Sequence, residues 1–545
     1  MSESEIAIRA AAAVNGLAAP TGSMRRASDV VVAAPRMATS ATRLGSLLLW
    51  AVSFPAMLGT FFVARVFVEG RAFFVDPDLW WHIKSGETIL ATHRWPTTDP
   101  FSFTVAGQPW LSYEWLGDVL IATVARVGGL RGLDFLLIAL GSAVILALYV
   151  LTSIRSGNSK AGLLASWLLF SLANASFSLR PQMLGYLFLI LTLIALERFR
   201  QGKPRALWFL PALFLVWINT HGSWVIGLGV VAVYWLSGLM AFHLGDIEAR
   251  RWTSAERLHI ASVFLLCLVA IPITPYGTQL AAYPFQVASS VPVSVANILE
   301  WQPMPFNLWG GKLFLVLLLA FFVLQIAFRF TWRLEELALF LGGTAMACLH
   351  LRFLLLFVPF FAPLFATIFA RWLPPYDRAK EHYVLNGLLM AAAVAAMIWY
   401  FPSRTDIQRK VAERFPVDAV DYLRQHPVPG PMFNAYGFGG YLIWSRGPEH
   451  KVFVDGRTEI YELGGVFPDY MHIIRLQPGA LSVLRAYGIQ SCLVERDEPL
   501  ATLLAALPDW QKLYSDNVSA LFVRRRSAES SDALPLAGPV RKEQR

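Results

Sequence analysis

The chain has 545 residues, of which 56% are hydrophobic and only 15% are charged, and its mean hydropathy is +0.50. Soluble domains carry about a quarter charged residues, so this composition excludes an ordinary soluble protein and predicts a polytopic α-helical membrane protein. The net charge of +9 does not indicate a nucleic-acid partner, because the Lys and Arg residues lie in short clusters between apolar runs. Three cysteines far apart in the sequence indicate neither a disulfide framework nor a thiol metal site.

Residues 1–41 are rich in Ala, Ser and Arg and lack the continuous apolar core of a signal peptide, so we expect a disordered cytoplasmic tail. The run 115–127 is too short to span a bilayer alone and contains Asp118, so we expect a re-entrant or surface helix there. Eleven longer runs are apolar enough to be transmembrane helices. They lie near residues 44–68, 132–154, 161–179, 182–198, 205–221, 224–243, 258–275, 312–328, 335–351, 353–370 and 383–401.

The charges of the loops orient these predicted spans. With the N-terminus in the cytoplasm, every inside loop carries two or more Lys or Arg, as the positive-inside rule requires. Outer loop 1 (residues 69–131) and a long outer loop (276–311) then lie on the opposite side. We therefore expect a multi-pass protein of the cell inner (plasma) membrane, with a transmembrane domain over residues 42–401.

After Phe401 the composition becomes typical of a soluble protein. Helical patterns alternate with short apolar runs, among them "PMFNAY", "KVFVDG", "IQSCLVE" and "ALFVRR", which we interpret as strands. This alternation predicts a small extracytoplasmic α/β domain over residues 402–526. Residues 527–545 are polar and predict a second disordered tail.

The first candidate for chemistry is a pair of acids in outer loop 1. Asp76 and Asp78 flank Pro77, and an extended backbone there would place both carboxylates on one side, about 6 to 7 Å apart. Such a pair suits a shared hard cation or a base with a neighbour that tunes it. Alternatively, Asp78 is the N-cap of a helix that follows it.

The residues after this pair have two interpretations each. Trp80 and Trp81 give the predicted helix an apolar side, which is typical of an anchor in the membrane interface. His82 is either a ligand or a solvated or capping residue. Asp99 and Glu114 are either turn residues or, together with Asp76, an acidic outer surface for a metal-assisted reaction on an anionic lipid.

Cationic groups occur at the outer ends of two predicted spans. Arg180 and Arg352 either extend to the interface by snorkelling or form a phosphate clamp, since guanidinium groups bind phosphate in a bidentate manner. His221 and His350 add possible acid, base or phosphate contacts, or are satisfied inside the helix bundle. Glu300 is the single acid of the long outer loop.

The order of these features resembles the catalytic subunit of membrane oligosaccharyltransferases and, more broadly, the GT-C class of glycosyltransferases. The stretches "DPDLWWHIKSGETIL" and "RWPTTDPFSFTVAG" look like the family's first outer loop, and "VPVSVANILEW" looks like its fifth, which ends in an acid. The segments "FNAYGFGGYLIW" and "KVFVDGRTEIY" occupy the place of the family's soluble-domain motif. The chain has Phe433, Asn434 and Ala435 where the family has Trp-Trp-Asp, so the resemblance does not extend to recognition of a glycosylation sequon.

The resemblance implies inverting transfer of a sugar from a polyprenyl-phosphate-linked donor to the hydroxyl of a glycan, lipid or protein at the outer face of the membrane. Its implied partners are the lipid bilayer, that donor and that acceptor. Mg²⁺ or Mn²⁺ use stays open. The alternative is a non-catalytic, membrane-anchored envelope assembly or sensor protein derived from a transferase fold.

The resemblance also assigns roles to the candidate residues. They are Asp76 and Asp78 in catalysis; Arg180, Arg352 and His350 at the donor phosphate; Glu300, Asp99, His82, His221 and Glu114 at the acceptor or a metal; and Tyr436, Asp455 and Arg457 in acceptor binding by the soluble domain. A metal, if used, would be held by Asp76, Asp78 and Glu300. The stretch "VDGRTEIY" is equally interpreted as a strand followed by a structural turn.

Overall fold

The computed structural model describes residues 40–74, 76–172, 177–290, 292–447 and 449–525. The chain divides into two compact units, Met1–Ala51 and Val52–Arg545. Within the first unit the described part is helix α2 (Ser40–Ala51). The predicted disordered tails, residues 1–41 and 527–545, lie outside the described residues except for the start of α2.

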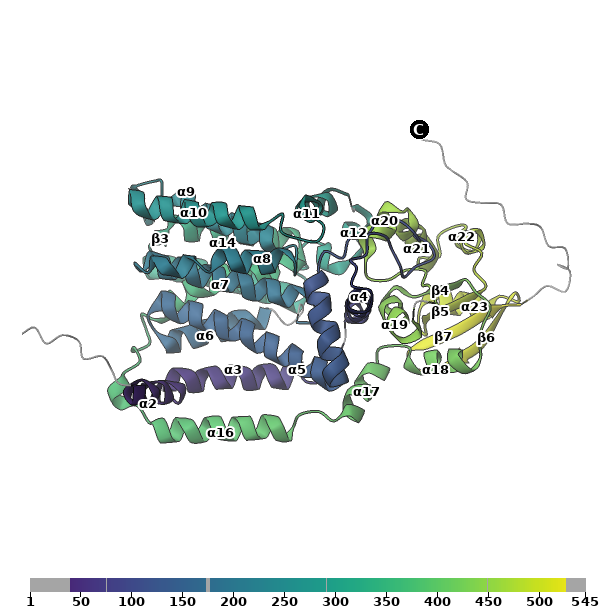
Figure 1. Cartoon of the computed structure of the whole chain (residues 1–545), viewed down its shortest axis with the longest axis horizontal. Helices are drawn as coiled ribbons and strands as arrows, with labels where there is room; N and C mark the ends of the chain where they lie inside the picture. Colours follow the sequence, from purple (N-terminus) through teal and green to yellow (C-terminus); the bar gives the residue numbers. More distant parts are fainter. Residues whose placement is uncertain (1–39, 75, 173–176, 291, 448, 526–545) are drawn as a thin grey trace, which may run out of the picture. The chain divides into compact units, whose positions relative to one another are not determined.

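Apolar helices that run side by side make up most of the second unit (Figure 1). They are α3 (Phe54–Gly70), α5 (Trp115–Ser156), α6 (Ser159–Phe170), α7 (Gln182–Arg200), α8 (Leu210–Ile218), α9 (Trp224–Ser237), α10 (Ser254–Ala270), α13 (Trp309–Ala327), α14 (Leu334–Leu349), α15 (Leu354–Phe369) and α16 (Tyr383–Trp399). Each predicted span overlaps one of these helices, and residues 173–176 of the run 161–179 lie outside the described residues. In the described part of the chain, four helices are individually long and apolar enough to cross a membrane, or up to six spans if two neighbouring helix pairs each count as one. The protein thus has the character of a membrane protein, while eleven spans remain a prediction.

Helix α5 contains the run that we expected to form a separate surface helix. The structure joins residues 115–127 to the following span, with a kink at Gly129, whose φ of 58° and ψ of −150° are not helical. Glycine suits this position because a side chain disfavours positive φ. The part of α5 before the kink lies across the ends of the neighbouring helices (Figure 1).

Short elements connect the long helices at both ends. On the side of the loops predicted to be outside, these are α4 (Asp78–Thr92), α11 (Thr278–Ser290), α12 (Pro292–Asn297), η3 (Leu299–Trp301) and η4 (Leu351–Phe353). The others are η2 (Pro204–Leu207), η5 (Arg378–Lys380) and a three-stranded sheet of β1 (Phe242–Leu244), β2 (Ile247–Ala249) and β3 (Trp332–Arg333).

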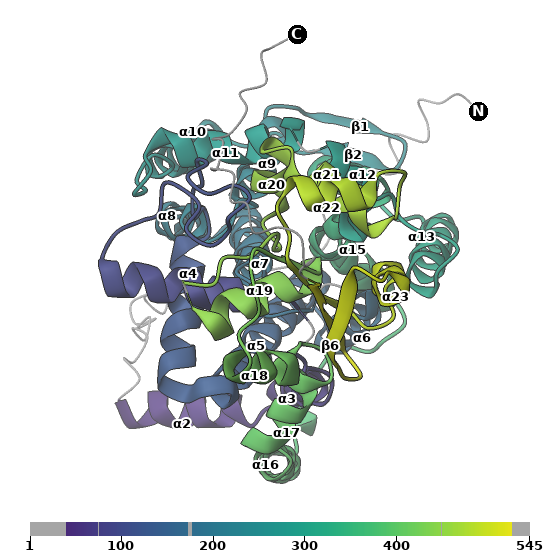
Figure 2. The ribbon, with the colours of Figure 1, turned by 90° about the vertical axis from the view of Figure 1, so that its right-hand side faces the viewer.

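The residues after α16 form helices around a second sheet. The helices are α17 (Arg404–Ala412), α18 (Val417–Gln425), α19 (Tyr436–Arg446), α20 (Thr458–Leu463), α21 (Val466–Ile474), α22 (Ala480–Ala486) and α23 (Pro499–Ala506). The strands are β4 (Met432–Asn434), β5 (Ser491–Glu495), β6 (Trp510–Ser515) and β7 (Ser519–Arg524), in the order β4-β5-β7-β6. In Figure 2, where these elements face the viewer, they lie in front of the helix ends.

The pattern of this sheet differs from the expectation in two places. The apolar run "KVFVDG" is not a strand of the sheet, because Val452 exchanges backbone hydrogen bonds with Phe101 and Phe103 of outer loop 1 instead. Strand β6 takes the fourth position, and it was not predicted because half of its residues are polar. Strand β5 is parallel to β4 and antiparallel to β7, with Cys492 opposite both Phe433 and Phe522 in the buried centre.

Helix α4 is a core helix, and the prediction that its Trp pair anchors it in the membrane interface is wrong. Trp80 is fully buried and Trp81 is 5% exposed. The Trp80 ring lies 4.8 Å from Trp444, 5.1 Å from Tyr441 and 5.3 Å from Phe415, measured between ring centroids. Aromatic packing inside the protein removes these rings from both water and lipid.

A buried ion-pair cluster also joins outer loop 1 to the C-terminal part. The Arg457 guanidinium lies 2.7 Å from Asp99 and 2.6 Å from Asp455, and Tyr461 donates a hydrogen bond to Asp455. All four side chains are at most 5% exposed. Buried charges persist only when they are paired, so this cluster depends on all its members.

We expect Arg457→Leu to destabilise the protein by about 3 to 5 kcal/mol, because it leaves two buried carboxylates without a cation. The measurement is thermal unfolding of the purified protein in detergent. Lys410→Gln removes the exposed Lys410–Glu413 pair and serves as control, with an expected loss below about 1 kcal/mol. Equal midpoints for the two variants would contradict a structural role of the buried cluster.

Candidate functional site

Three acids from the loops predicted to be outside converge on one guanidinium. Arg180, which precedes α7, forms a charged hydrogen bond through Nε with Asp76. Its Nη2 lies 3.1 Å from Asp78 Oδ2, and its Nη1 lies 3.6 Å from Glu300 Oε1. Residues separated by more than two hundred positions in sequence therefore share one electrostatic centre, which we call the Arg180 centre (Asp76, Asp78, Arg180 and Glu300).

The start of α4 places the two aspartates differently from the expectation. Pro77 is the N-cap with φ −67° and ψ −22°, so the backbone turns into the helix there and is not extended. The Asp76 carboxylate accepts a hydrogen bond of 2.9 Å from the Asp78 N–H. The Asp78 carboxylate caps nothing among the described residues, because its Oδ2 faces Arg180 and its Oδ1 has no hydrogen-bond partner there. The interpretation of Asp78 as the N-cap is therefore wrong, and Asp76 satisfies one of the free N–H groups of the helix.

The two carboxylates differ in their electrostatics. Burial would raise the pKa of Asp76, but the adjacent Arg180 charge and hydrogen bond hold it below the usual value. Burial raises the pKa of Asp78, and the charges of Asp76 and Glu300 act in the same direction against the lowering effect of Arg180. Asp78 Oδ1 is buried and has no hydrogen-bond partner among the described residues. Asp78 thus has an oxygen that can accept a proton.

The C-terminal part covers Asp78 closely. A Cβ atom at Gly456 would overlap Asp78 Oδ1, and one at Gly440 would overlap the carbonyl oxygen of Pro77. Only glycine permits these approaches. Tyr436 donates a hydrogen bond of 3.4 Å to the Gly456 carbonyl, and its pKa is raised well above the usual value by burial and by the Asp78 charge. Tyr436 therefore lies close to the Arg180 centre, as a neutral phenol.

Arg352 lies beside this centre with a different kind of partner. Its guanidinium carbon is 3.9 Å from the centroid of the Trp301 ring, and Trp301 follows Glu300 directly. His350 Nδ1 is 2.5 Å from the Trp301 carbonyl oxygen, so it orients the same residue. Within the described ranges Arg352 forms no ion pair with a carboxylate. A stacked guanidinium without an acidic partner keeps its donors for an anionic ligand.

A second cluster joins α4 to α5 and contains two further candidate residues, His82 and His221. His82 Nδ1 is 2.6 Å from Asp118, and His82 Nε2 is 3.7 Å from Glu114. The opposite oxygen of Glu114 lies 3.4 Å from His221 Nε2. Asp118 also accepts hydrogen bonds from Ser85 and Ser112. We call this set the histidine cluster (His82, Glu114, Asp118 and His221).

The pKa shifts decide the charges of this cluster. Burial would lower the pKa of His82, but Asp118 and Glu114 raise it above the usual value. Burial raises the pKa of Glu114 to about 8, and burial together with the charge of Arg352 lowers the pKa of His221 to about 3. Near neutral pH, Glu114 is therefore a protonated acid beside a neutral His221, and Asp118 favours the charged form of His82.

The structure contradicts the expected acidic outer surface. Asp76, Asp99 and Glu114 are 8%, 5% and 7% exposed. Asp99 pairs with Arg457 and lies in the cluster that joins outer loop 1 to the C-terminal part. Asp455 and Arg457 are likewise buried in that cluster, so neither side chain is presented to solvent as an acceptor contact.

The described residues do not fit a site for the divalent cation whose use the sequence left open. They contain no group of three or more His, Cys, Asp or Glu side chains that could hold a metal ion. Asp76, Asp78 and Glu300 do converge, but the Arg180 guanidinium occupies the position between them. No step is therefore assigned to a metal.

The sequence analysis missed several polar residues that join the long outer loop to the C-terminal part. Tyr283 donates a hydrogen bond of 3.0 Å to Glu459, and its ring stacks on Tyr113 at 4.7 Å. Glu462 accepts hydrogen bonds from the backbone N–H groups of Val293 and Ser294. Glu459 and Glu462 lie three residues apart in α20 and share a helix face, but no helix was predicted there because the segment was interpreted as a strand and turn.

A cavity of about 710 Å³ lies near α4, but it is a different place from the Arg180 centre. Neither Asp76, Asp78 nor Glu300 lines it. The three acids of the Arg180 centre are therefore not part of this cavity.

Comparison with solved structures finds similar folds at low identity. A structure of the oligosaccharyltransferase of Archaeoglobus fulgidus tethered with an acceptor peptide has 12% identity and a TM-score of 0.47, over 86% of this chain and 74% of that one. ArnT of Cupriavidus metallidurans bound to undecaprenyl phosphate has 15% identity and a TM-score of 0.45, over 91% and 100% of the chains. Both are GT-C glycosyltransferases, the class that the sequence resembles. At these values the similarity assigns neither substrate nor activity. No family model and no curated protein matches the chain.

The raised pKa of Glu114 predicts a specific dependence of stability on pH. The pKa is 4.5 in the unfolded chain and about 8 in the folded protein, so the folded state binds the extra proton between these values. This contribution is fully present below pH 4.5 and is lost as pH rises through about 8. We expect the thermal midpoint of the wild type to fall more steeply between about pH 6 and pH 9 than that of Glu114→Gln.

Thermal unfolding in detergent at a series of pH values tests this dependence. The exposed Glu413 provides a matched control, and Glu413→Gln should keep the slope of the wild type. Parallel curves for Glu114→Gln and the wild type would contradict the protonated state of Glu114.

Proposed function

We propose that the protein transfers a sugar from a polyprenyl-phosphate-linked donor to an acceptor hydroxyl, with inversion, at the outer face of the membrane. The observation that carries this proposal is Asp78, a buried carboxylate with a raised pKa and an oxygen without a hydrogen-bond partner among the described residues. It lies next to the Arg180 guanidinium, which three acids contact, and near Arg352, which has no acidic partner among the described residues. A proton acceptor beside an anion-binding group is what glycosyl transfer from a phosphate leaving group requires.

In the proposed reaction, Asp78 Oδ1 accepts the proton of the acceptor hydroxyl. The acceptor oxygen then forms a bond to the anomeric carbon from the face opposite the phosphate. The bond between the anomeric carbon and the phosphate oxygen breaks, and the electron pair leaves with the polyprenyl phosphate. Attack from the opposite face inverts the configuration of the anomeric carbon.

Arg352 is our candidate for binding the departing phosphate. Stacking on Trp301 restricts the orientation of its guanidinium, and the His350 ring packs edge-on against the Trp301 ring, with 6.0 Å between the centroids. Donors held in place before the reaction stabilise developing negative charge without reorganising. Arg180 differs, because three carboxylates already occupy it; we assign it the role of positioning Asp76, Asp78 and Glu300.

Glu300 and the C-terminal part are proposed to contact the acceptor. The Glu300 side chain is 40% exposed, which makes it the most accessible acid of the Arg180 centre. Tyr436 and Gly456 border Asp78 on the other side. Asp455 and Arg457 act indirectly, since their ion pair holds the loop that contains Gly456.

The proposed orientation places the N-terminus in the cytoplasm and the C-terminal part outside the cell inner membrane. The loops predicted to be inside carry buried ion pairs, Arg155 with Glu336 and Arg200 with Glu335. The Arg180 centre is formed by loops from the opposite ends of the same helices. The support for this orientation is the positive-inside rule, because each loop predicted to be inside carries two or more Lys or Arg.

The alternative function is a non-catalytic envelope assembly or sensor protein. It is favoured by the low exposure of Asp76 and Asp78, both 8%, and by the absence of the three acids from the lining of the 710 Å³ cavity. An activity assay separates the two functions directly.

We expect Asp78→Asn to lower the transfer rate by about 10² to 10⁴, the contribution of a positioned general base. Because the base must be ionised, activity of the wild type should fall as pH drops through the raised pKa of Asp78. The assay uses membranes with radiolabelled polyprenyl-phosphate sugars and detects labelled acceptor. Asp421→Asn, on the surface of α18, is the control. Full activity of Asp78→Asn, or no labelled product from the wild type with any donor, would contradict the proposal.

We expect Arg352→Gln to weaken donor use more than Arg352→Lys, because lysine keeps a positive charge but loses the planar stacking and the bidentate geometry. Steady-state kinetics with a soluble short-chain donor measures both variants. A loss that appears only in the KM of the acceptor would contradict a role at the phosphate.

A further inference from the structure

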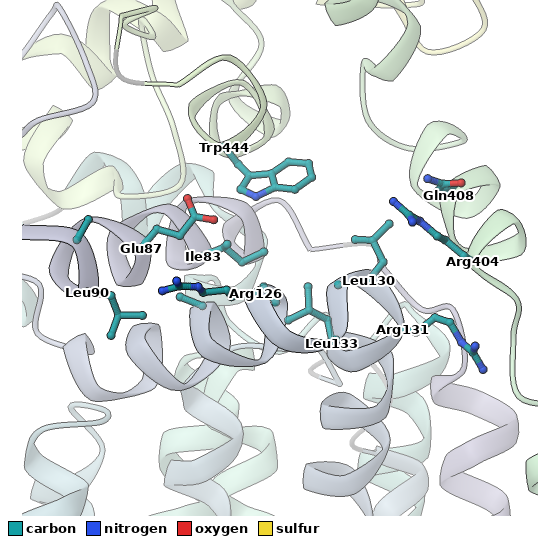
Figure 3. A pocket seen from close by; sticks show the side chains of 15 residues that line it. Ile83, Glu87, Leu90, Arg126, Leu130, Arg131, Leu133, Arg404, Gln408 and Trp444 are labelled. Carbon is teal, nitrogen blue, oxygen red and sulfur yellow. The ribbon is translucent and has the colours of Figure 1, made fainter.

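The 710 Å³ cavity is lined by residues of α4, α5, α17 and α19. Figure 3 shows Arg404 and Gln408 of α17 on one side, Glu87 and Arg126 on the other, and Ile83, Leu130, Leu133 and Trp444 between them. The kink of α5 at Gly129 also borders it. A volume of this size is typical of a small-molecule site.

More basic than acidic side chains line the cavity. Three arginines line it, namely Arg126, Arg131 and Arg404, against the single acid Glu87. Glu87 already pairs with Lys84 at 3.2 Å. Arg131 lies 5.4 Å from the ring centroid of Phe401, and within the described ranges neither Arg126 nor Arg404 has an ion-pair partner. The cavity therefore offers guanidinium donors to an anion.

The interior surface of the cavity is apolar. Ile83 is fully buried and Leu133 is 1% exposed, while Leu90, Leu130 and Trp444 complete the lining. An apolar lining with cationic groups at its edges favours an amphiphile over a free ion, since a free phosphate would gain nothing from the apolar surface.

The cavity also lies at the level where apolar helix surfaces end. Next to its arginines, Val127 is 85% and Phe135 is 64% exposed. The last turn of α16 has exposed apolar residues too, with Trp399 at 82%, and the Arg71 guanidinium at the end of α3 donates to the Tyr400 carbonyl at 3.3 Å. Exposed apolar faces bordered by basic residues are typical of the zone of lipid headgroups.

We propose that this cavity binds the phosphate headgroup of an anionic membrane lipid, with Arg126 and Arg404 on the two sides of the phosphate. The acyl chains would extend along the exposed apolar faces of α3, α5 and α16. The site does not depend on the proposed sugar transfer, because none of its lining residues belongs to the Arg180 centre. A lipid bound there would connect α4 and α5 to α17.

The test measures lipid binding to the full-length protein purified in detergent, by native mass spectrometry with phosphatidylglycerol and phosphatidylcholine as probes. We expect the wild type to prefer phosphatidylglycerol, and Arg126→Gln/Arg404→Gln to weaken that binding by about tenfold or more. Gln408→Trp fills the cavity from its exposed side without a change of charge, and it should weaken binding as well. Arg409→Gln, one residue along α17 and outside the cavity, is the matched control.

The outcomes separate the possible sources of binding. Retention of phosphatidylglycerol by both the double variant and Gln408→Trp would overturn the proposal. An equal loss in Arg409→Gln would overturn it too, because it would show attraction by general surface charge. Full displacement of the lipid by millimolar inorganic phosphate would indicate a site for free anions instead. If the double variant does not fold, Gln408→Trp and the comparison of the two lipids decide the question alone.

Discussion

The ion pairs of Arg180 are the interaction on which the arrangement of the candidate site depends. One guanidinium neutralises part of the charge of Asp76, Asp78 and Glu300, which arrive from two loops far apart in the sequence. Without a cation, three buried or half-buried carboxylates would repel one another. The same arrangement gives the two aspartates different pKa values. Asp76 contacts Arg180 more closely and its pKa is lowered, while the pKa of Asp78 is raised.

Helix α4 connects this centre to the rest of the molecule. Its first residue is Asp78, its Trp80 packs against aromatic rings of the C-terminal part, and its His82 pairs with Asp118 of α5. The C-terminal part approaches so closely that glycine is required at Gly456. The position of Asp78 is therefore determined by packing on several sides, as expected of a group that must meet a reacting atom.

Much of the helical architecture could be predicted because periodicity and apolar run length depend on local sequence. Each of the eleven predicted runs overlaps a helix of the described part of the chain. The predicted strand "KVFVDG" was wrong for a tertiary reason, since its backbone pairs with outer loop 1 and not with the sheet. The Trp pair was misassigned in the same way, because an amphipathic pattern does not distinguish lipid from an aromatic core.

Composition, run lengths and loop charges by themselves determined the class of protein and the helical segments, and they placed the four residues of the Arg180 centre among the candidates. The tertiary structure decided the partners, because a charged side chain has no preferred counterion in sequence. In the folded chain Arg180 forms ion pairs with three carboxylates, whereas Arg352 stacks on Trp301. The tertiary structure also buried Asp99 and Glu114, which the sequence allowed as turn residues or as part of an acidic outer surface. Pairing and burial depend on which segments meet in space, and that is a property of the whole fold.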